Sequence, residues 1–339
     1  MISEEYSRKR KDKYSRYMDL VSSVVLGDGK KQNLKIIDKD YLIKTLKTNR
    51  VPIRFFGKTK QKNRYLTKEK ERVKHALELI KRITEEFDKR KIPFVFIKTL
   101  ENLPDIGQDI DIYTEASIKE LDTLFIKGFK AKLGEASFSD RIARKRNYLI
   151  GEVPIEVHCS RLGQVGEDSK LATEILRNRK TVKINGIKIY SPMIEHKLML
   201  MAQQRVYRHL NIRICDVYNT LKIIKDIDTG KLKKISKKYG MREGVILYLS
   251  YINKIARYYA KNHIIESKIR VRDWPSEIKD RNMHFRFPEF STALKSYSSK
   301  IISYLLKMDV PGLLRLSLVL PLGVMHVMEA VFIRKNNVW

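Results

Sequence analysis

The chain has 339 residues, of which 70 are Lys or Arg and 39 are Asp or Glu, so its formal net charge is +31 with His neutral. The hydrophobic fraction of 43% is enough for a buried core and excludes disorder over most of the chain. Only two cysteines occur, Cys159 and Cys215. This excludes a disulfide-rich secreted scaffold and a thiolate zinc site, and it favours a reducing, cytoplasmic setting.

The excess of positive charge predicts a polyanionic partner, because Lys and Arg beside phosphates release condensed counterions and steer association. Nucleic acid is the first such partner, and a solvated basic surface is the alternative. The charge is densest near the start of the chain, with runs at Arg8–Lys13 and Lys58–Lys74. The first residues contain no apolar run of the kind found in secretory signals, so we do not expect export.

Residues 1–66 form a basic N-terminal region, in which Met18, Val21 and Val25 give one helix an apolar side. Over residues 67–89 apolar side chains recur at three- and four-residue steps, which predicts an amphipathic helix with Thr67 as its N-cap. Short apolar or alternating runs predict strands at 93–98, 109–113 and 154–158, and a helix is predicted at 117–125. These elements predict an α/β (α+β) fold with a small mixed sheet flanked by helices.

Beyond Ser191 the pattern is helical almost throughout, with helices expected from Pro192, over 212–224 and over 248–259. We therefore divide the chain into a basic N-terminal region (1–66), a core (67–190) and a helical C-terminal region (191–339). Charged residues and a proline interrupt the apolar stretch 313–333, so we expect no transmembrane span there. We interpret this stretch as a buried helix, and attachment to an anionic membrane surface is the alternative.

Two carboxylates occur on one predicted strand. Asp109 and Asp111 are two residues apart, so both emerge on the same face, while Ile110 and Ile112 point the other way. Carboxylates this close repel one another unless a cation neutralises them, and Mg²⁺ prefers such oxygen ligands. Glu156 on another alternating strand is the natural third carboxylate. The pattern predicts a site for Mg²⁺ or Mn²⁺ that performs phosphoryl or nucleotidyl transfer; an edge strand with a solvated acidic face is the alternative.

The arrangement of these strands resembles the polymerase-β-like nucleotidyltransferase fold. The resemblance rests on Ile97-Lys98-Thr99, on Asp109-Ile110-Asp111-Ile112 and on Ile155-Glu156-Val157-His158. It covers about residues 70–226 and extends to Glu195-His196-Lys197-Leu198 and to the segment Arg213–Tyr218. Within the superfamily the chain is most similar to uncharacterised nucleotidyltransferases and to the toxin-type enzymes of toxin–antitoxin systems. The resemblance makes residues 67–190 a nucleotidyltransferase core.

The resemblance also implies roles for individual residues. Asp109 and Asp111 would bind the metal ions, and Glu156 would complete the site and help to activate the acceptor hydroxyl. Nucleotide binding would fall to four further residues, with Lys98 facing the triphosphate: Lys98, Thr99, Lys197 and Asp216. His158 would orient Glu156 or touch a phosphate, and a hydrogen-bonded core histidine is the alternative.

The chain departs from the family pattern at two places. Thr99 stands where the family has a glycine or serine turn that lets backbone N–H groups approach the phosphates, and Asn219 replaces a second aspartate. Either Lys98 and the Thr99 hydroxyl replace the missing contacts, or the fold now serves as a binding module.

Three functions therefore remain open, and the last of them is a membrane-surface partner protein that uses the apolar C-terminal segment. The first is a metal-dependent nucleotidyltransferase that moves a nucleoside monophosphate from an NTP to an acceptor and releases pyrophosphate. The basic charge combined with the resemblance indicates an RNA acceptor such as a tRNA end, with protein as another acceptor, and an antitoxin-type protein partner is compatible with it. The second is a non-catalytic RNA-binding protein on a decayed nucleotidyltransferase fold.

Overall fold

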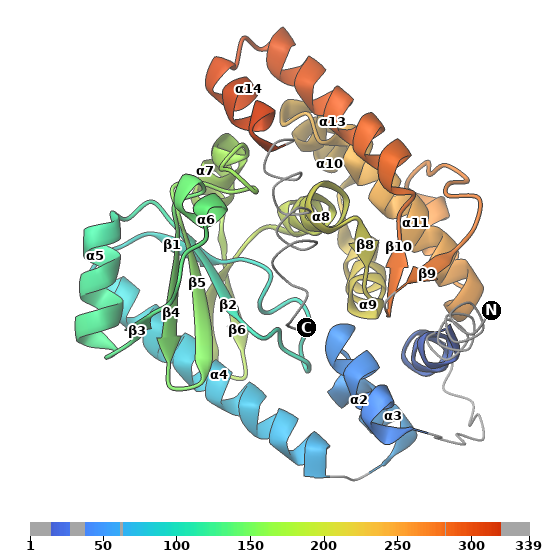
Figure 1. The fold of residues 1–339 in the computed structure, drawn as a ribbon, viewed down its shortest axis with the longest axis horizontal. Helices are drawn as coiled ribbons and strands as arrows, with labels where there is room; N and C mark the ends of the chain where they lie inside the picture. Colours follow the sequence, from blue (N-terminus) through green and yellow to red (C-terminus); the bar gives the residue numbers. More distant parts are fainter. Residues whose placement is uncertain (1–14, 28–37, 62–63, 282, 320–339) are drawn as a thin grey trace, which may run out of the picture. The chain divides into compact units, whose positions relative to one another are not determined.

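The structure is a computed structural model that describes residues 15–27, 38–61, 64–281 and 283–319. It confirms the predicted α+β fold, with small sheets flanked by helices (Figure 1). The chain forms two compact units, each built from separate segments. Unit 1 contains residues 1–82, 98–108 and 194–297, and unit 2 contains residues 83–97, 109–193 and 298–339. The division of the chain into three regions at residues 66 and 190 stays a prediction.

Unit 2 is built on a five-stranded sheet in the order β1-β2-β5-β4-β3. Its strands are β1 (Phe94–Phe96), β2 (Ile110–Thr114), β3 (Lys132–Leu133), β4 (Lys145–Ile150) and β5 (Val153–Cys159). The β2 and β5 strands pair in parallel, and the other neighbours are antiparallel. The predicted strands at 93–98, 109–113 and 154–158 therefore correspond to β1, β2 and β5, and they are adjacent in the sheet.

One face of this sheet packs against helices through aromatic side chains. Phe87 near the end of α4 (Arg64–Lys89) lies 4.5 Å from Phe94 between ring centroids. The Phe125 ring, in the turn of π-helix η1 (Thr123–Gly128), stacks on Tyr148 of β4 at 4.5 Å. Unit 2 also contains α5 (Ile118–Asp122), α6 (Phe138–Ile142), α7 (Ser169–Arg177) and the β6 (Lys180–Ile184) and β7 (Ile187–Ser191) hairpin. This packing leaves the other face of β2, β5 and β4 to polar side chains.

Unit 1 is mainly helical and includes a small antiparallel sheet in the order β8-β10-β9. Its elements are the helix at residues 15–26, α2 (Lys39–Thr48), α3 (Pro52–Thr59), α8 (Ile194–Ala202), η2 (Gln203–His209), β8 (Asn211–Ile212), α9 (Ile214–Ile223), η3 (Ile224–Asp226), α10 (Thr229–Lys238), α11 (Arg242–Ala260), α12 (Ile264–Lys268), β9 (Lys279–Arg281) and β10 (His284–Arg286). The C-terminal region is thus helical with a short sheet that the sequence pattern did not predict.

The described part of the basic N-terminal region packs within unit 1. The Asn49 side chain donates to the Met283 carbonyl at 2.9 Å and accepts from the Ile214 N–H at 3.0 Å. Arg54 pairs with buried Asp105 at 3.0 Å. The described part of the region is therefore a component of unit 1, joined to residues far away in the sequence.

The start of α4 differs from the predicted one. Thr67 is not an N-cap, because α4 begins at Arg64; Tyr65 donates to Glu69 one turn ahead at 3.0 Å, and this contact favours the extra helical turn.

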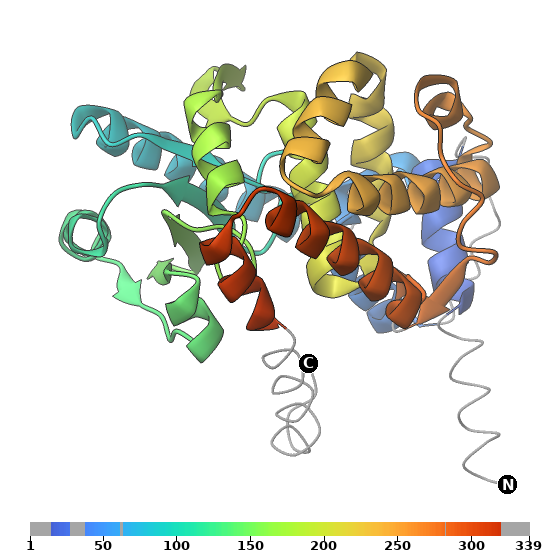
Figure 2. The same ribbon diagram turned by 90° about the horizontal axis from the view of Figure 1, so that it is seen from above.

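The helices α13 (Glu289–Leu306) and α14 (Val310–Ser317) end the described chain, and α14 turns sharply away from the end of α13 (Figure 2). Residues 320–339, which hold most of the predicted buried apolar helix, lie outside the described residues.

No helix among the described residues has both the length and the apolar character needed to cross a bilayer.

Candidate functional site

Two predicted acidic residues lie side by side on neighbouring strands. The parallel register of β2 and β5 places Asp111 beside Glu156 and Tyr113 beside His158. Side chains alternate along a strand, so these four residues share one face of the sheet. Ile110, Ile112 and Val157 are buried on the opposite face. The apolar residues of the two strands therefore fix which way the acidic pair points.

His158 completes a compact cluster with this pair. Its Nε2 atom lies 2.7 Å from Glu156 Oε1 and 3.7 Å from Asp111 Oδ1. One ligand atom from each of the three residues lies within 4.8 Å of the other two. The His158 ring is almost completely buried, whereas the Glu156 side chain keeps 20% of its surface exposed. Glu156 is thus the member of the cluster that solvent or a substrate reaches.

Lys145 on β4 also reaches this cluster. Its ammonium lies 3.0 Å from Glu156 Oε1 and 3.7 Å from Asp140 Oδ1, and only 2% of its side chain is exposed. The antiparallel register pairs Lys145 with His158, which places both on the same face. Lys145 is not among the predicted site residues, because the alternation of β4 is too polar to predict a strand. A signal was present, since Gly151 and Glu152 form a two-residue loop between Ile150 and Val153, and glycine favours such hairpin turns.

The donor set of the cluster fits a divalent metal ion. Asp111 and Glu156 offer carboxylate oxygens, and His158 offers an imidazole nitrogen. Mg²⁺ takes oxygen ligands almost exclusively, whereas a first-row transition ion such as Mn²⁺ also accepts imidazole. The buried Lys145 ammonium already offsets part of the negative charge, so an ion would compete with it for Glu156.

Asp109 lies in the bend just before β2 and does not belong to the three-residue cluster. The structure therefore brings together two of the three predicted carboxylates, and His158 takes the third place. The assignment of Asp109 as a metal ligand stays a prediction.

The predicted nucleotide-binding residues lie in unit 1. Lys98, Lys197 and Asp216 line one cavity together with Arg50 and Arg205. Its volume of about 40 Å³ holds a few water molecules, and a nucleotide needs several hundred Å³. In this form of unit 1 the cavity does not admit a triphosphate.

Two of these residues have clear structural roles. Asp216 caps α9 by accepting from the Arg213 N–H at 2.7 Å, and it forms an ion pair with Arg205 at 2.7 Å. Lys98 has a φ of +68°, a left-handed conformation that glycine adopts at lower cost. The chain thus turns after β1 at Lys98 itself. Thr99 is buried and is not among the residues that line the cavity.

His209 lies close to Arg205 and Arg213 in the sequence, and its titration should make the stability of the folded chain sensitive to acid. Burial, followed by repulsion from Arg205, Arg208 and Arg213, lowers its pKa to about 2. In the unfolded chain the ring binds a proton below its ordinary pKa of 6.5, whereas the folded chain excludes it. We expect the contribution of His209 to the free energy of unfolding to be fully present above pH 6.5 and to fall by about 1.4 kcal/mol for each pH unit below it.

Urea unfolding at neutral and acidic pH measures this effect, and the His209→Gln variant removes the titrating group. The variant should lose less stability than the parent on acidification, by about 2 kcal/mol at pH 5. Equal losses in the two proteins would show that other groups carry the acid sensitivity.

Both cysteines are free and buried, and burial raises the pKa of each thiol to about 12. Neither is therefore a thiolate at neutral pH.

Comparison with known proteins leaves the family of the chain open. No family model and no curated protein matches it. Among solved structures it is similar to an antigenic nucleotidyltransferase-like protein from Paracoccidioides brasiliensis, with 14% identity and a TM-score of 0.40. The match covers 57% of this chain and 93% of that protein. A similarity this low does not assign a fold or an activity.

Proposed function

We propose that the chain is a metal-dependent nucleotidyltransferase that moves a nucleoside monophosphate from an NTP to RNA and releases pyrophosphate. The observation that carries this proposal is the convergence of Asp111, Glu156 and His158, whose ligand atoms lie within 4.8 Å of one another on paired strands. Carboxylates clustered at the end of a small mixed sheet are an unfavourable arrangement for stability alone, because they repel one another.

In this reaction an acceptor hydroxyl oxygen forms a bond to the α-phosphorus of the NTP. The bond between that phosphorus and the oxygen leading to the β-phosphate breaks, and pyrophosphate leaves. The hydroxyl proton passes to Glu156, the most exposed carboxylate of the cluster, whose Oε1 atom lies 2.7 Å from His158 Nε2. A metal ion held by Asp111, Glu156 and His158 would offset the charge of the polyphosphate.

The contribution of Lys98, Thr99, Lys197 and Asp216 to nucleotide binding is part of this proposal and rests on the sequence resemblance. The small cavity in unit 1 does not by itself argue for it. The RNA acceptor is supported by the net charge of +31, which favours a polyanion over a cationic small molecule.

One observation favours a second candidate, a non-catalytic RNA-binding protein. The buried Lys145 ammonium neutralises Glu156 at 3.0 Å, as a decayed site would do without a metal ion. The two candidates differ in whether a divalent ion displaces this contact.

Labelled NTPs separate the candidates. Purified protein is incubated with each α-labelled NTP, Mn²⁺ or Mg²⁺ and total cellular RNA or a protein extract, and the fraction that gains label is identified. We expect label in RNA and its loss in Glu156→Gln. Glu152→Gln, which changes an exposed residue of the β4–β5 loop, is the matched control. No label in any fraction with any NTP would reject the enzyme, and label in protein alone would reject the RNA acceptor.

A further inference from the structure

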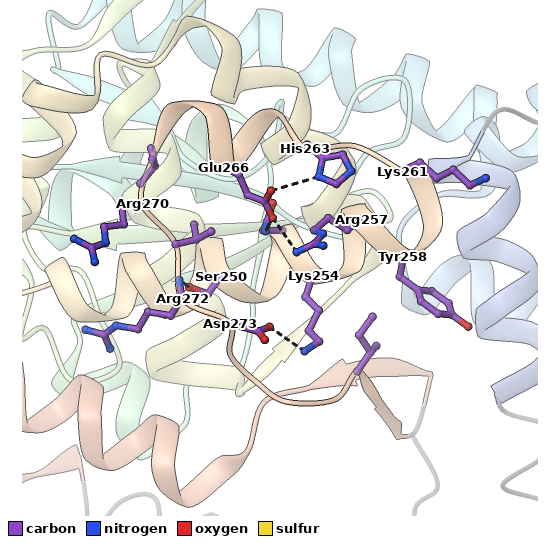
Figure 3. A pocket seen from close by; sticks show the side chains of 14 residues that line it. Ser250, Lys254, Arg257, Tyr258, Lys261, His263, Glu266, Arg270, Arg272 and Asp273 are labelled. Carbon is purple, nitrogen blue, oxygen red and sulfur yellow. Dashed lines mark hydrogen bonds and ion pairs between the residues drawn. The ribbon is translucent and has the colours of Figure 1, made fainter.

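A second cavity in unit 1 lies away from the residues discussed so far. It is a groove of about 900 Å³ between the second half of α11, α12 and the segment that follows α12 (Figure 3). Its volume is at the upper end of the range for ligand pockets. The groove is therefore large enough for a segment of polymer and is not limited to a single small ion.

Positive charge dominates the lining of this groove. Five cationic side chains line it, against two acidic ones, Glu266 and Asp273. The cationic residues are Lys254, Arg257, Lys261, Arg270 and Arg272. At neutral pH the formal charges of the lining sum to about +3, and Glu243 beside the groove pairs with Arg272 and offsets one of them, so the groove attracts anions.

Internal ion pairs occupy the centre of the groove. Arg257 lies 3.1 Å from Glu266, and His263 lies 3.4 Å from the same carboxylate. Lys254 donates to the carbonyls of Pro275 and Ser276 at 2.6 Å and contacts Asp273. Figure 3 shows the ion pairs of Glu266 and of Lys254 with Asp273 in the middle of the view. These groups shape the groove, and their charges are largely balanced.

Two cations at opposite sides of the groove are available to a ligand. Lys261 and Arg270 are exposed, and no ion pair joins either of them to another residue in the described part of the chain. Figure 3 shows them pointing outward on opposite sides, with Arg272 beside Arg270. Positive charges separated in this way match several phosphates along a strand better than one phosphate.

An exposed aromatic side chain accompanies these charges. Tyr258 follows Arg257 on α11, and 70% of its surface is exposed. An exposed tyrosine on the same side as Lys261 provides a face on which a base stacks, at about 1–3 kcal/mol per base. A flat bilayer does not follow a concave groove, so these features favour a single strand over an anionic membrane.

We infer that this groove binds single-stranded RNA, with Lys261 and Arg270 contacting phosphates and Tyr258 stacking on a base. The inference rests on the proposed function, since it supplies a binding surface for the RNA acceptor. It adds a site on α11 and α12, whereas the sequence analysis located the basic charge in the N-terminal region.

The test is a double variant of the full chain, Lys261→Gly with Arg270→Ala. Lys261 follows the end of α11 with a φ of +47°, where glycine is the preferred residue, so its replacement removes charge without a backbone penalty. Lys233→Ala with Lys234→Ala removes two exposed lysines from α10 and is the control with the same charge.

Affinity for a fluorescent single-stranded uridine oligonucleotide is measured by anisotropy between about 50 and 200 mM salt. The groove variant should bind about 25-fold more weakly at 0.1 M salt, with the slope of log K against log salt reduced by about 1.4, because each contact to a single strand contributes about 0.7. Tyr258→Leu should weaken binding with the salt slope unchanged. The α10 control should retain the parent affinity.

Several results would overturn the inference. One is an equal loss of RNA affinity in the groove variant and in the α10 control. Another is an unchanged RNA affinity of the groove variant. Loss of flotation with phosphatidylserine vesicles by that variant, with its RNA affinity unchanged, would also overturn it. Binding of NTP with Mn²⁺ is measured in parallel on the same proteins. If NTP binding is intact while the groove variant keeps its RNA affinity, the groove is rejected as an RNA site and the proposed enzyme stands. If the parent binds RNA through the groove yet binds no NTP, the proposed enzyme is rejected and the RNA site stands.

Discussion

Replacing Asp111 with Asn should abolish metal-dependent NTP binding and lower nucleotidyl transfer by at least about 10²–10³-fold, the loss typical for a group that stabilises charge in the transition state. Asn has the shape of Asp but lacks the charge that holds a divalent ion. The side chain is 6% exposed and lies 3.7 Å from His158, so water is poorly placed to replace it.

The same variant should be at least as stable as the parent in metal-free buffer. Asp111 and Glu156 are neighbours in the register, and removing one negative charge relieves their repulsion. Calorimetry of NTP with Mn²⁺ and thermal melting measure the two effects together. Asp88→Asn, which breaks an exposed pair with Lys188, is the control. Full NTP binding by Asp111→Asn would remove the metal site from the proposal.

Replacing Lys145 with Met should lower the free energy of unfolding by about 3–5 kcal/mol in buffer that contains a chelator, the usual cost of breaking a buried ion pair. The ammonium is 2% exposed and offsets both Glu156 and Asp140. Without it, the acidic cluster has lost its nearest buried positive charge.

Mn²⁺ should restore part of this loss, because an ion that binds only the folded chain stabilises it in proportion to the logarithm of its concentration over Kd. We expect a larger rise of the urea midpoint with Mn²⁺ in Lys145→Met than in the parent or in the exposed control Lys132→Met. If Mn²⁺ stabilises none of the three proteins, Lys145 is the permanent counter-charge of the cluster. That result would support the non-catalytic alternative.

Local patterns were sufficient to predict three of the elements around the cluster. Alternation with a period of two indicated β2 and β5, and the three- to four-residue steps of apolar residues indicated α4. The period of two also placed Asp111 opposite in direction to Ile110 and Ile112, and the pairing of Asp111 with Glu156 puts it on the face of the cluster. Each of these properties depends on a few consecutive residues, and the sequence contains them directly.

The membership of the cluster depends on pairing between strands. Whether Asp111 faces Glu156 or a residue one position away is decided by the register of β2 on β5, and a shift of one residue would turn every side chain to the other face. The position of Lys145 depends in the same way on β4, a strand that polar residues concealed.

The amino-acid order alone thus established β1, β2 and β5, the inward and outward faces of β2 and β5, the basic charge and the acidic pattern of Asp109, Asp111 and Glu156. Folding in three dimensions brought Asp111 to Glu156 and His158, added Lys145 to the cluster, joined Asn49 to Met283 and Ile214, and formed the basic groove on α11 and α12. The physical reason is separation along the chain. Side-chain alternation is a property of neighbouring residues, whereas contacts between distant segments depend on how the whole core packs.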